Sequence, residues 1–142
     1  FGTDRPLFAL LDTFYEKKQK EEGKTMFKLP YNLAPINLMV FPLVKDKNLI
    51  KISKEIKKEL ENNFVIVYDE VASIGKRYLR AAEVGTPYCI TIDFDSVKKK
   101  DVTIRNRDSE KQIRVKIKEL KDILNKLFNN EIKFEKAGKL VR

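Results

Sequence analysis

The apolar and polar positions of the chain follow two periods in turn, one typical of buried strands and one typical of helices. Continuous apolar runs at residues 36–44, 64–69 and 87–94 predict buried strands. Between them, residues 49–60 repeat apolar side chains at helical spacing, opposite a face of charged side chains, and residues 73–85 predict a further helix that ends at Gly85. The first strand, helix and strand therefore predict a βαβ unit with a right-handed crossover.

The second half of the chain predicts a β-hairpin followed by a helix. Residues 102–108 and 112–117 alternate apolar and polar positions, and residues 108–110 between them predict a tight turn. A lysine-rich turn is expected before the hairpin at 98–101. After the hairpin, apolar residues recur with a helical period over 118–130.

Together these elements predict an α/β fold with a mixed five-stranded sheet flanked by helices. The tail at 131–142 has no clear period, and no element is predicted there. At the other end, residues 5–18 predict a helix with Asp4 as its N-cap and Pro6 in its first turn. This helix is very apolar, so we expect it to dock on the rest of the chain or on a neighbouring molecule. The polar residues 19–34 predict a linker.

The composition agrees with one folded domain and excludes several kinds of chemistry. The chain has 142 residues, of which 42% are hydrophobic and 36% charged, and no apolar run reaches the ~20 residues of a membrane-spanning helix. Its first residue is not Met, so we expect a fragment. There is no histidine, which excludes Ser-His and Cys-His catalysis. The single cysteine, Cys89, lies in an apolar run and is predicted to be buried and unreactive.

The charge of the chain favours a polyanionic partner, most often nucleic acid. Lys and Arg number 30 against 21 for Asp and Glu, giving a net charge of +9. Arginine occurs at only seven positions, and five of them fall within 77–80 and 105–114. Because a guanidinium is planar and bidentate, we expect recognition in those two stretches.

Side chains in and near these stretches suit the recognition of unpaired RNA. The basic and aromatic candidates, expected to project together from the 73–85 helix and the hairpin, are Lys76, Arg77, Tyr78, Arg80, Arg105 and Arg107, with Arg114 as a further candidate. The acidic candidates, which can accept a hydrogen bond from the exocyclic amine of cytosine, are Glu83, Asp93, Asp95 and Asp108. Arginine planes and a tyrosine can stack on splayed bases. Pairing of these charges with one another on a solvated surface remains an open alternative.

Catalytic motifs are absent or incomplete. No G-x-G-x-x-G follows the first predicted strand. Residues 75–76 resemble the end of a phosphate-binding loop, but Glu70 stands at the position of its first glycine and Arg77 at that of its Ser or Thr. A carboxylate pair formed by Asp93 and Asp95 is a weak alternative metal or acid–base site. No metal ligand set is predicted.

Three blocks of sequence resemble the C-terminal domain of glycyl-tRNA synthetases: SIGKRYLRAAEVGTP at 73–87, TIDFDS at 91–96 and TIRNRDSEKQIRV at 103–115. The run LAPINLMVFPLV at 33–44 is similar to the start of that domain. The opening FGTDRPLFALLD at 1–12 resembles the end of motif 3 of class II synthetases. The combination of GKRYxR with ExGTP and DFD points to the glycine branch of these enzymes.

The resemblance implies the anticodon-binding fold of class II synthetases, shared with the prolyl, threonyl and histidyl enzymes. It also implies binding of the anticodon stem-loop of tRNA-Gly, whose anticodons end in two cytidines. The implied organisation is a remnant of the catalytic domain at 1–18, a linker at 19–34, an anticodon-binding domain at 35–130 and a C-terminal tail at 131–142.

For the parent enzyme the resemblance implies a cytoplasmic, homodimeric glycine–tRNA ligase that uses ATP, Mg²⁺ and glycine. The motif 3 arginine that contacts ATP carries over onto Arg5, within the ATP-binding turn Gly2, Thr3 and Asp4. Motifs 1 and 2 are absent, so we expect this chain by itself to be inactive, to bind neither ATP nor Mg²⁺, and to lack the main dimer contacts.

Two further functions stay open. One is a stand-alone nucleic-acid-binding relative, such as a polymerase accessory subunit, and the other is a small-molecule-binding α/β domain. The intact turn at 2–5 favours a ligase. The sequence also departs from the pattern of the family, which usually has small polar residues and glycine where Val71 and Ala72 stand, and an aspartate where Ala82 stands.

Overall fold

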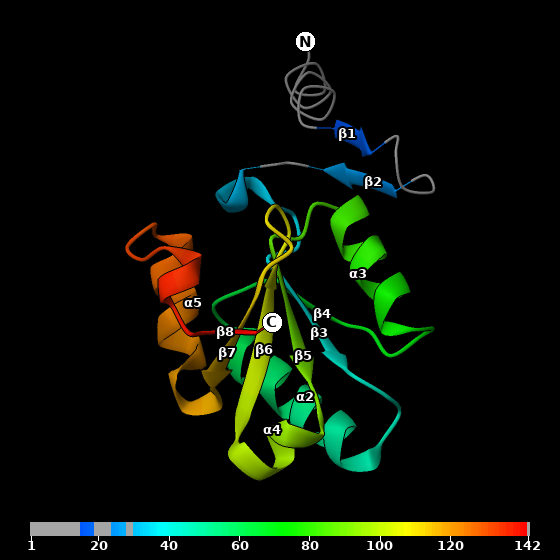
Figure 1. Cartoon of the computed structure of the whole chain (residues 1–142), viewed down its shortest axis with the longest axis vertical. Coiled ribbons are helices and arrows are strands. Elements are labelled where there is room, and N and C mark those ends of the chain that lie inside the picture. The colour runs from blue at the N-terminus through cyan, green and yellow to red at the C-terminus, as the bar shows by residue number, and fades with distance from the viewer. Residues whose placement is uncertain (1–14, 19–23, 28–29, 142) are drawn as a thin grey trace.

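The computed structural model describes residues 15–18, 24–27 and 30–141 (Figure 1). The predicted ATP-binding turn and residues 5–14 of the predicted helix lie outside them. Within the described part, β1 (Tyr15–Lys18) pairs antiparallel with β2 (Lys24–Phe27). The prediction of a helix through residue 18 is therefore wrong, because these backbone groups bond to a second strand. The predicted linker likewise contains β2 and the short 3₁₀ turn η1 (Tyr31–Leu33).

The main body alternates helices and strands along the chain as predicted. Its elements are β3 (Leu38–Pro42), α2 (Lys47–Leu60), β4 (Ile66–Tyr68), α3 (Ile74–Glu83), β5 (Tyr88–Ile92), α4 (Phe94–Lys99), β6 (Asp101–Asn106), β7 (Gln112–Lys116), η2 (Ile117–Glu119), α5 (Leu120–Phe128), η3 (Phe134–Lys136) and β8 (Lys139–Val141).

These strands form a mixed six-stranded sheet in the order β4-β3-β5-β6-β7-β8. Strand β3 is parallel to β4 and β5, and the later pairs are antiparallel. The mixed α/β sheet is confirmed, with six strands instead of five. The additional strand is β8, formed by the tail for which no element was predicted. At the other edge, β4 confirms the strand predicted within 64–69, but its residues are only partly buried, so the prediction of a buried strand is wrong in that respect.

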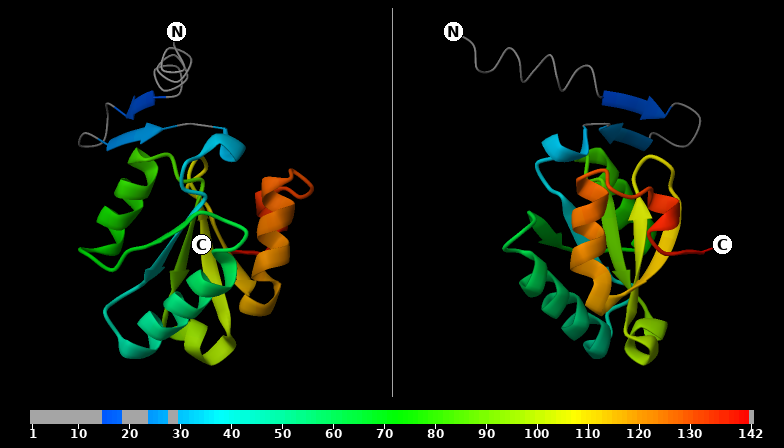
Figure 2. Two further views of the ribbon diagram at one scale, coloured as in Figure 1. Left: turned by 180° about the vertical axis from the view of Figure 1, so that it is seen from behind. Right: turned by 90° about the vertical axis from the view of Figure 1, so that its left-hand side faces the viewer.

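The two faces of the sheet are covered unequally. Val40, Ile90 and Ile104 point to one face and are fully buried in the main core beneath α2 and α5. On the other face, α3 covers a smaller cluster that includes Phe41 and Cys89. Helices α3 and α5 therefore lie on opposite sides of the sheet (Figure 2). The strands beyond β5 carry polar side chains on the α3 side.

Side-chain caps explain where several helices begin. The Asp46 carboxylate accepts hydrogen bonds from the backbone at the start of α2, and the Ser73 hydroxyl accepts one from the backbone of Lys76 in α3. Asp93 and Ser96 form a reciprocal capping box that begins α4. This short helix begins at the end of the predicted third strand and runs into the first two residues of the predicted lysine-rich turn, where no helix was predicted.

Candidate nucleic-acid interface

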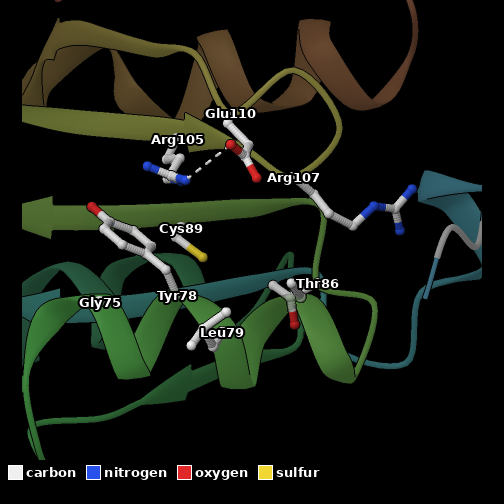
Figure 3. A pocket seen from close by; sticks show the side chains of 9 residues that line it. Gly75, Tyr78, Leu79, Thr86, Cys89, Arg105, Arg107 and Glu110 are labelled. Carbon is white, nitrogen blue, oxygen red and sulfur yellow. Dashed lines mark ion pairs between the residues drawn. The ribbon is translucent and has the colours of Figure 1, made fainter. Parts of the chain in front are cut away.

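A pocket of about 270 Å³ opens between helix α3 and the sheet, near the end of β6 (Figure 3). Tyr78 reaches it from α3 and Arg105 from β6, while Glu110 comes from the turn after β6. Cys89 of β5 is paired in register with Arg105, so both point to this side of the sheet. The parallel start of the sheet and the antiparallel hairpin therefore meet at this pocket.

Arg105 and Tyr78 form a stacked pair in this pocket. The guanidinium carbon of Arg105 lies 4.6 Å from the centroid of the Tyr78 ring. The Tyr78 hydroxyl is 2.6 Å from the Thr91 hydroxyl, and its ring packs edge-on against Phe41 at 5.6 Å between centroids. Burial raises the pKa of Tyr78, so the phenol stays protonated near neutral pH. These contacts hold the ring, and the ring in turn supports a guanidinium whose side chain is still 27% exposed.

A carboxylate and a hydroxyl complete the polar lining. The Glu110 Oε2 atom lies 3.9 Å from Arg105 Nη2. The Thr86 Oγ1 atom is buried and has no hydrogen-bond partner among the described residues. Burial raises the pKa of the Cys89 thiol to about 12, so the sulfur is a neutral, apolar part of the wall. The pocket thus offers a flat cation, an acceptor and an apolar wall, which suits a planar ligand with a polar edge.

Glu110 was not among the sequence candidates. It lies in the turn between β6 and β7 and has a positive φ of 59°. Asp108 in the same turn was a candidate, but the sequence pattern gave no sign that Glu110 would face Arg105. The signal available in the sequence was the predicted hairpin itself. Glu110 lies only five residues after Arg105, in the turn of that hairpin, so both side chains are expected at the same end of the sheet.

Arg107 is buried and anchors the loops at this end of the sheet. Its guanidinium donates to the Gly85 carbonyl at 3.0 Å and to the Asp108 carboxylate at 2.9 Å, and it lies 5.0 Å from the Tyr31 ring centroid. The Tyr31 hydroxyl donates to Asp108 at 3.1 Å. Figure 3 shows Arg107 turned away from Arg105. Both arginines line the pocket as predicted, but the guanidinium of Arg107 is buried and does not project beside that of Arg105, because Arg107 lies beyond the end of β6.

Arg77 is also buried, with 3% of its surface exposed. Its guanidinium donates to the carbonyls of Pro42, Leu43 and Asp69 at the ends of β3 and β4. Buried backbone carbonyls need hydrogen-bond partners, and Arg77 supplies donors to these three where the parallel strands end. Arg77 therefore fixes α3 to the sheet and is not exposed for RNA, contrary to the prediction from the sequence.

Arg80 and Lys76 lie on α3 outside the pocket. Arg80 donates to the Val71 carbonyl and pairs with Asp69 at 3.0 Å, so it supports the loop before α3. Lys76 is exposed. The prediction that all three side chains project to one side is wrong for Arg77, which is buried, whereas Lys76 and Arg80 line one shallow hollow on α3. Ala72 in that loop has a left-handed φ of 67°, which favours the glycine of the family pattern.

The remaining acidic candidates lie away from the pocket. Glu83 and Asp95 are exposed on α3 and α4. Asp93 caps α4 and pairs with Arg114, which also pairs with Asp101. Burial acts to raise the pKa of Asp93, but hydrogen bonds from Arg114 and Ser96 outweigh it and lower the pKa. Asp93 and Arg114 therefore stabilise the start of α4 and its contact with the sheet.

The described residues show no sign of a metal site or of a membrane span. No group of three or more His, Cys, Asp or Glu side chains among them could hold a metal ion. None of the helices in this part of the chain is long and apolar enough to cross a membrane.

The chain is similar in sequence to several known proteins. Three glycine–tRNA ligases are similar to the chain: that of Pyrococcus horikoshii is 45% identical over 128 residues, that of Thermococcus gammatolerans 45% over 132 and that of Bacillus cereus 44% over 126. These alignments cover 89%, 92% and 88% of this chain but 22%, 23% and 27% of the relatives. The chain thus spans about a quarter of their length.

A solved structure matches the fold of the chain, and a family model matches its sequence. A solved prolyl-tRNA synthetase from Cryptosporidium parvum superposes with a TM-score of 0.68 at 21% identity, covering 73% of this chain and 23% of that one. At this identity the likeness shows the fold alone. The family model described as the anticodon binding domain matches residues 37–127, which include the whole pocket. The chain therefore belongs to the anticodon-binding domain family.

Proposed function

We propose that this chain is the anticodon-binding part of a glycine–tRNA ligase and that it binds the anticodon stem-loop of tRNA-Gly. Support comes from the family match and from relatives that are named glycine–tRNA ligase. The net charge of +9 favours an RNA partner.

The observation that carries the proposal is the stacked pair of Arg105 and Tyr78 beside Glu110. Proteins read single-stranded RNA by stacking splayed bases on aromatic rings or guanidinium planes and by bonding to the base edges. A glutamate accepts a hydrogen bond from the N4 amine of cytosine, and an arginine donates to its ring acceptors. The pocket therefore has the groups to receive a cytidine, the base that ends glycine anticodons.

The remaining parts of the reaction belong to the whole ligase. We propose that ATP would there supply the activation of the glycine carboxylate, that Mg²⁺ would offset the charge of its phosphates, and that the whole ligase is a cytoplasmic homodimer. Gly2, Thr3, Asp4 and Arg5 are the proposed ATP contacts and lie outside the described residues. In this proposal, the described part of the chain contributes only the binding of RNA.

The test is the affinity of the chain for two RNA stem-loops, measured by fluorescence anisotropy at moderate salt. One carries the glycine anticodon, and the other has both cytidines replaced by uridines. We expect tighter binding to the cytidine loop and a loss of that preference in Arg105→Ala. Lys51→Ala, on the exposed face of α2, is the control. Equal binding of both loops by the unaltered chain would contradict base readout.

A further inference from the structure

The α3 side of the sheet continues beyond the pocket as a polar surface. Arg105 on β6 is paired in register with Gln112, and Thr103 with Arg114, so these side chains point to the same side. Arg114 is paired in turn with Lys139 of β8. The opposite side of the same strands carries the fully buried Ile104 and Ile113 of the main core. The sheet thus keeps its apolar side under α2 and α5 and leaves a charged side beyond the edge of α3.

Lysines gather at the far end of this polar side. Two adjoining hollows of about 650 and 270 Å³ share Lys99 and Lys116 in their lining. The exposed lysines that line one or both hollows, here called the lysine surface, are Lys99, Lys100, Lys116, Lys118 and Lys139.

The lysine surface keeps its positive charge unpaired. Among residues 30–141, none of its five amines has a carboxylate within 4.0 Å, whereas Lys57, Lys111 and Lys126 elsewhere all do. The Lys116 amine donates to the Lys99 carbonyl at 3.0 Å, which holds β7 against the end of α4. The one carboxylate in the wider hollow is Glu119. The surface is therefore a concentration of positive charge that the described part of the chain does not neutralise.

The lysine surface and the pocket lie at opposite ends of one strand. Arg105 stands near the end of β6 and Asp101 at its start, beside the lysine surface. Four residues of extended strand span ~13 Å. That distance corresponds to a few phosphates along a nucleic-acid strand, taking the ~3.4 Å of helix axis for each phosphate of one strand of duplex DNA as a guide. An RNA whose loop enters the pocket can therefore bring its backbone over the lysines.

We infer that the lysine surface binds the sugar–phosphate backbone of the same RNA whose loop enters the pocket. This inference rests on the proposed function and adds a second contact to it. Ammonium groups bind phosphate as point charges, and contacts to phosphate fix position and affinity without reading the bases. The two hollows are lined by no aromatic side chain, so they hold no stacking platform for a base. The pocket supplies base readout and the lysine surface supplies salt-dependent affinity.

The test compares two triple variants that remove the same charge from different surfaces. Lys99→Gln/Lys116→Gln/Lys139→Gln alters the lysine surface. Lys47→Gln/Lys51→Gln/Lys58→Gln alters exposed lysines of α2, which lies on the other side of the sheet. Affinity for the glycine and uridine stem-loops is measured by anisotropy over a range of salt concentrations, after circular dichroism has shown that both variants are folded.

We expect the first variant to bind both stem-loops about tenfold more weakly at low salt. Its plot of log affinity against log salt should be shallower by roughly two, because each lost phosphate contact removes about 0.7–0.9 from the slope. The ratio between the two loops should stay unchanged. Equal losses in the two triple variants, with base preference intact, would overturn this inference and leave the proposed function standing. Failure of the unaltered chain to bind either loop would overturn both.

Discussion

The guanidinium of Arg105 lies 4.6 Å from the ring of Tyr78, which joins a side chain of the sheet to a side chain of helix α3 in one stacked pair. The Tyr78 ring is held by an edge-on contact with Phe41 and by the hydrogen bond between its hydroxyl and that of Thr91. A flat cation supported in this way loses little side-chain freedom when a base stacks on it. The guanidinium of Arg105 is therefore preorganised to stack on a planar base.

The planarity of Arg105 can be tested apart from its charge. Arg105→Lys keeps the positive charge but removes the plane that stacks, so we expect about tenfold weaker binding of the glycine stem-loop, in keeping with ~1–3 kcal/mol for a stacked or bidentate contact. The salt dependence should stay close to that of the unaltered chain. Anisotropy at several salt concentrations measures both quantities. Unchanged affinity would mean that charge alone accounts for the contribution of Arg105.

Arg77 should matter for stability instead of recognition. Arg77→Met removes the donors to the carbonyls of Pro42, Leu43 and Asp69, which are left without these partners. We expect the free energy of unfolding to fall by about 2–3 kcal/mol, as for other hydrogen bonds to charged groups. Urea unfolding followed by circular dichroism measures the change. The neighbouring Lys76→Met is the control, because Lys76 is exposed, and a similar loss in both variants would contradict the anchoring role.

The sequence allowed most of the fold to be predicted, because long elements carry long patterns. The helix at 47–60 and the hairpin strands repeat their apolar residues often enough to define a period. Helix α4 and strand β8 are too short for that. The first depends on a capping box and the second on pairing with β7, which lies far away in sequence. Neither kind of contact leaves a periodic signal.

For the site, the pattern located the right stretches but not the direction of each side chain. Arg105 and Tyr78 were predicted and do meet in the pocket. Arg77 and Arg107 were predicted with them, but both are buried against backbone carbonyls. Arginine serves equally well to bond an RNA and to satisfy the carbonyls where strands end. Only the position of the strand ends distinguishes these roles, and that position is set by the tertiary fold.

Ala72 should be a point of strain in the loop before α3. Its φ of 67° places a β-carbon in the left-handed region, which costs roughly 1–2 kcal/mol for a residue other than glycine. We expect Ala72→Gly to raise the free energy of unfolding by about 1 kcal/mol, after allowance for the greater freedom of glycine in the unfolded chain. Ala82→Gly within α3 is the matched control and should lower stability by about 1 kcal/mol. A loss of stability in both variants would contradict the strain.

The ion pair of Asp93 and Arg114 should make stability depend on pH. The folded structure lowers the pKa of Asp93 below its ordinary value of 3.8. A depressed carboxyl pKa stabilises the fold above the unfolded value and loses that effect as pH falls through the folded pKa. We therefore expect the stability difference between the unaltered chain and Asp93→Asn to be largest above about pH 4 and to shrink in more acidic solution. Urea unfolding across this range measures it, and a constant difference would contradict the ion pair.

The central claim, that the pocket reads a cytidine, is tested most directly by changing Glu110 to Gln. The amide adds a donor beside Arg105, so it can bond to the O4 atom of uracil as well as to the amine of cytosine. The measurement is the ratio of affinities for the glycine stem-loop and its uridine counterpart. We predict that Glu110→Gln lowers this ratio about tenfold, whereas Glu83→Gln, an exposed carboxylate outside the pocket, leaves it unchanged. An unaltered ratio in Glu110→Gln would contradict cytidine readout at this pocket.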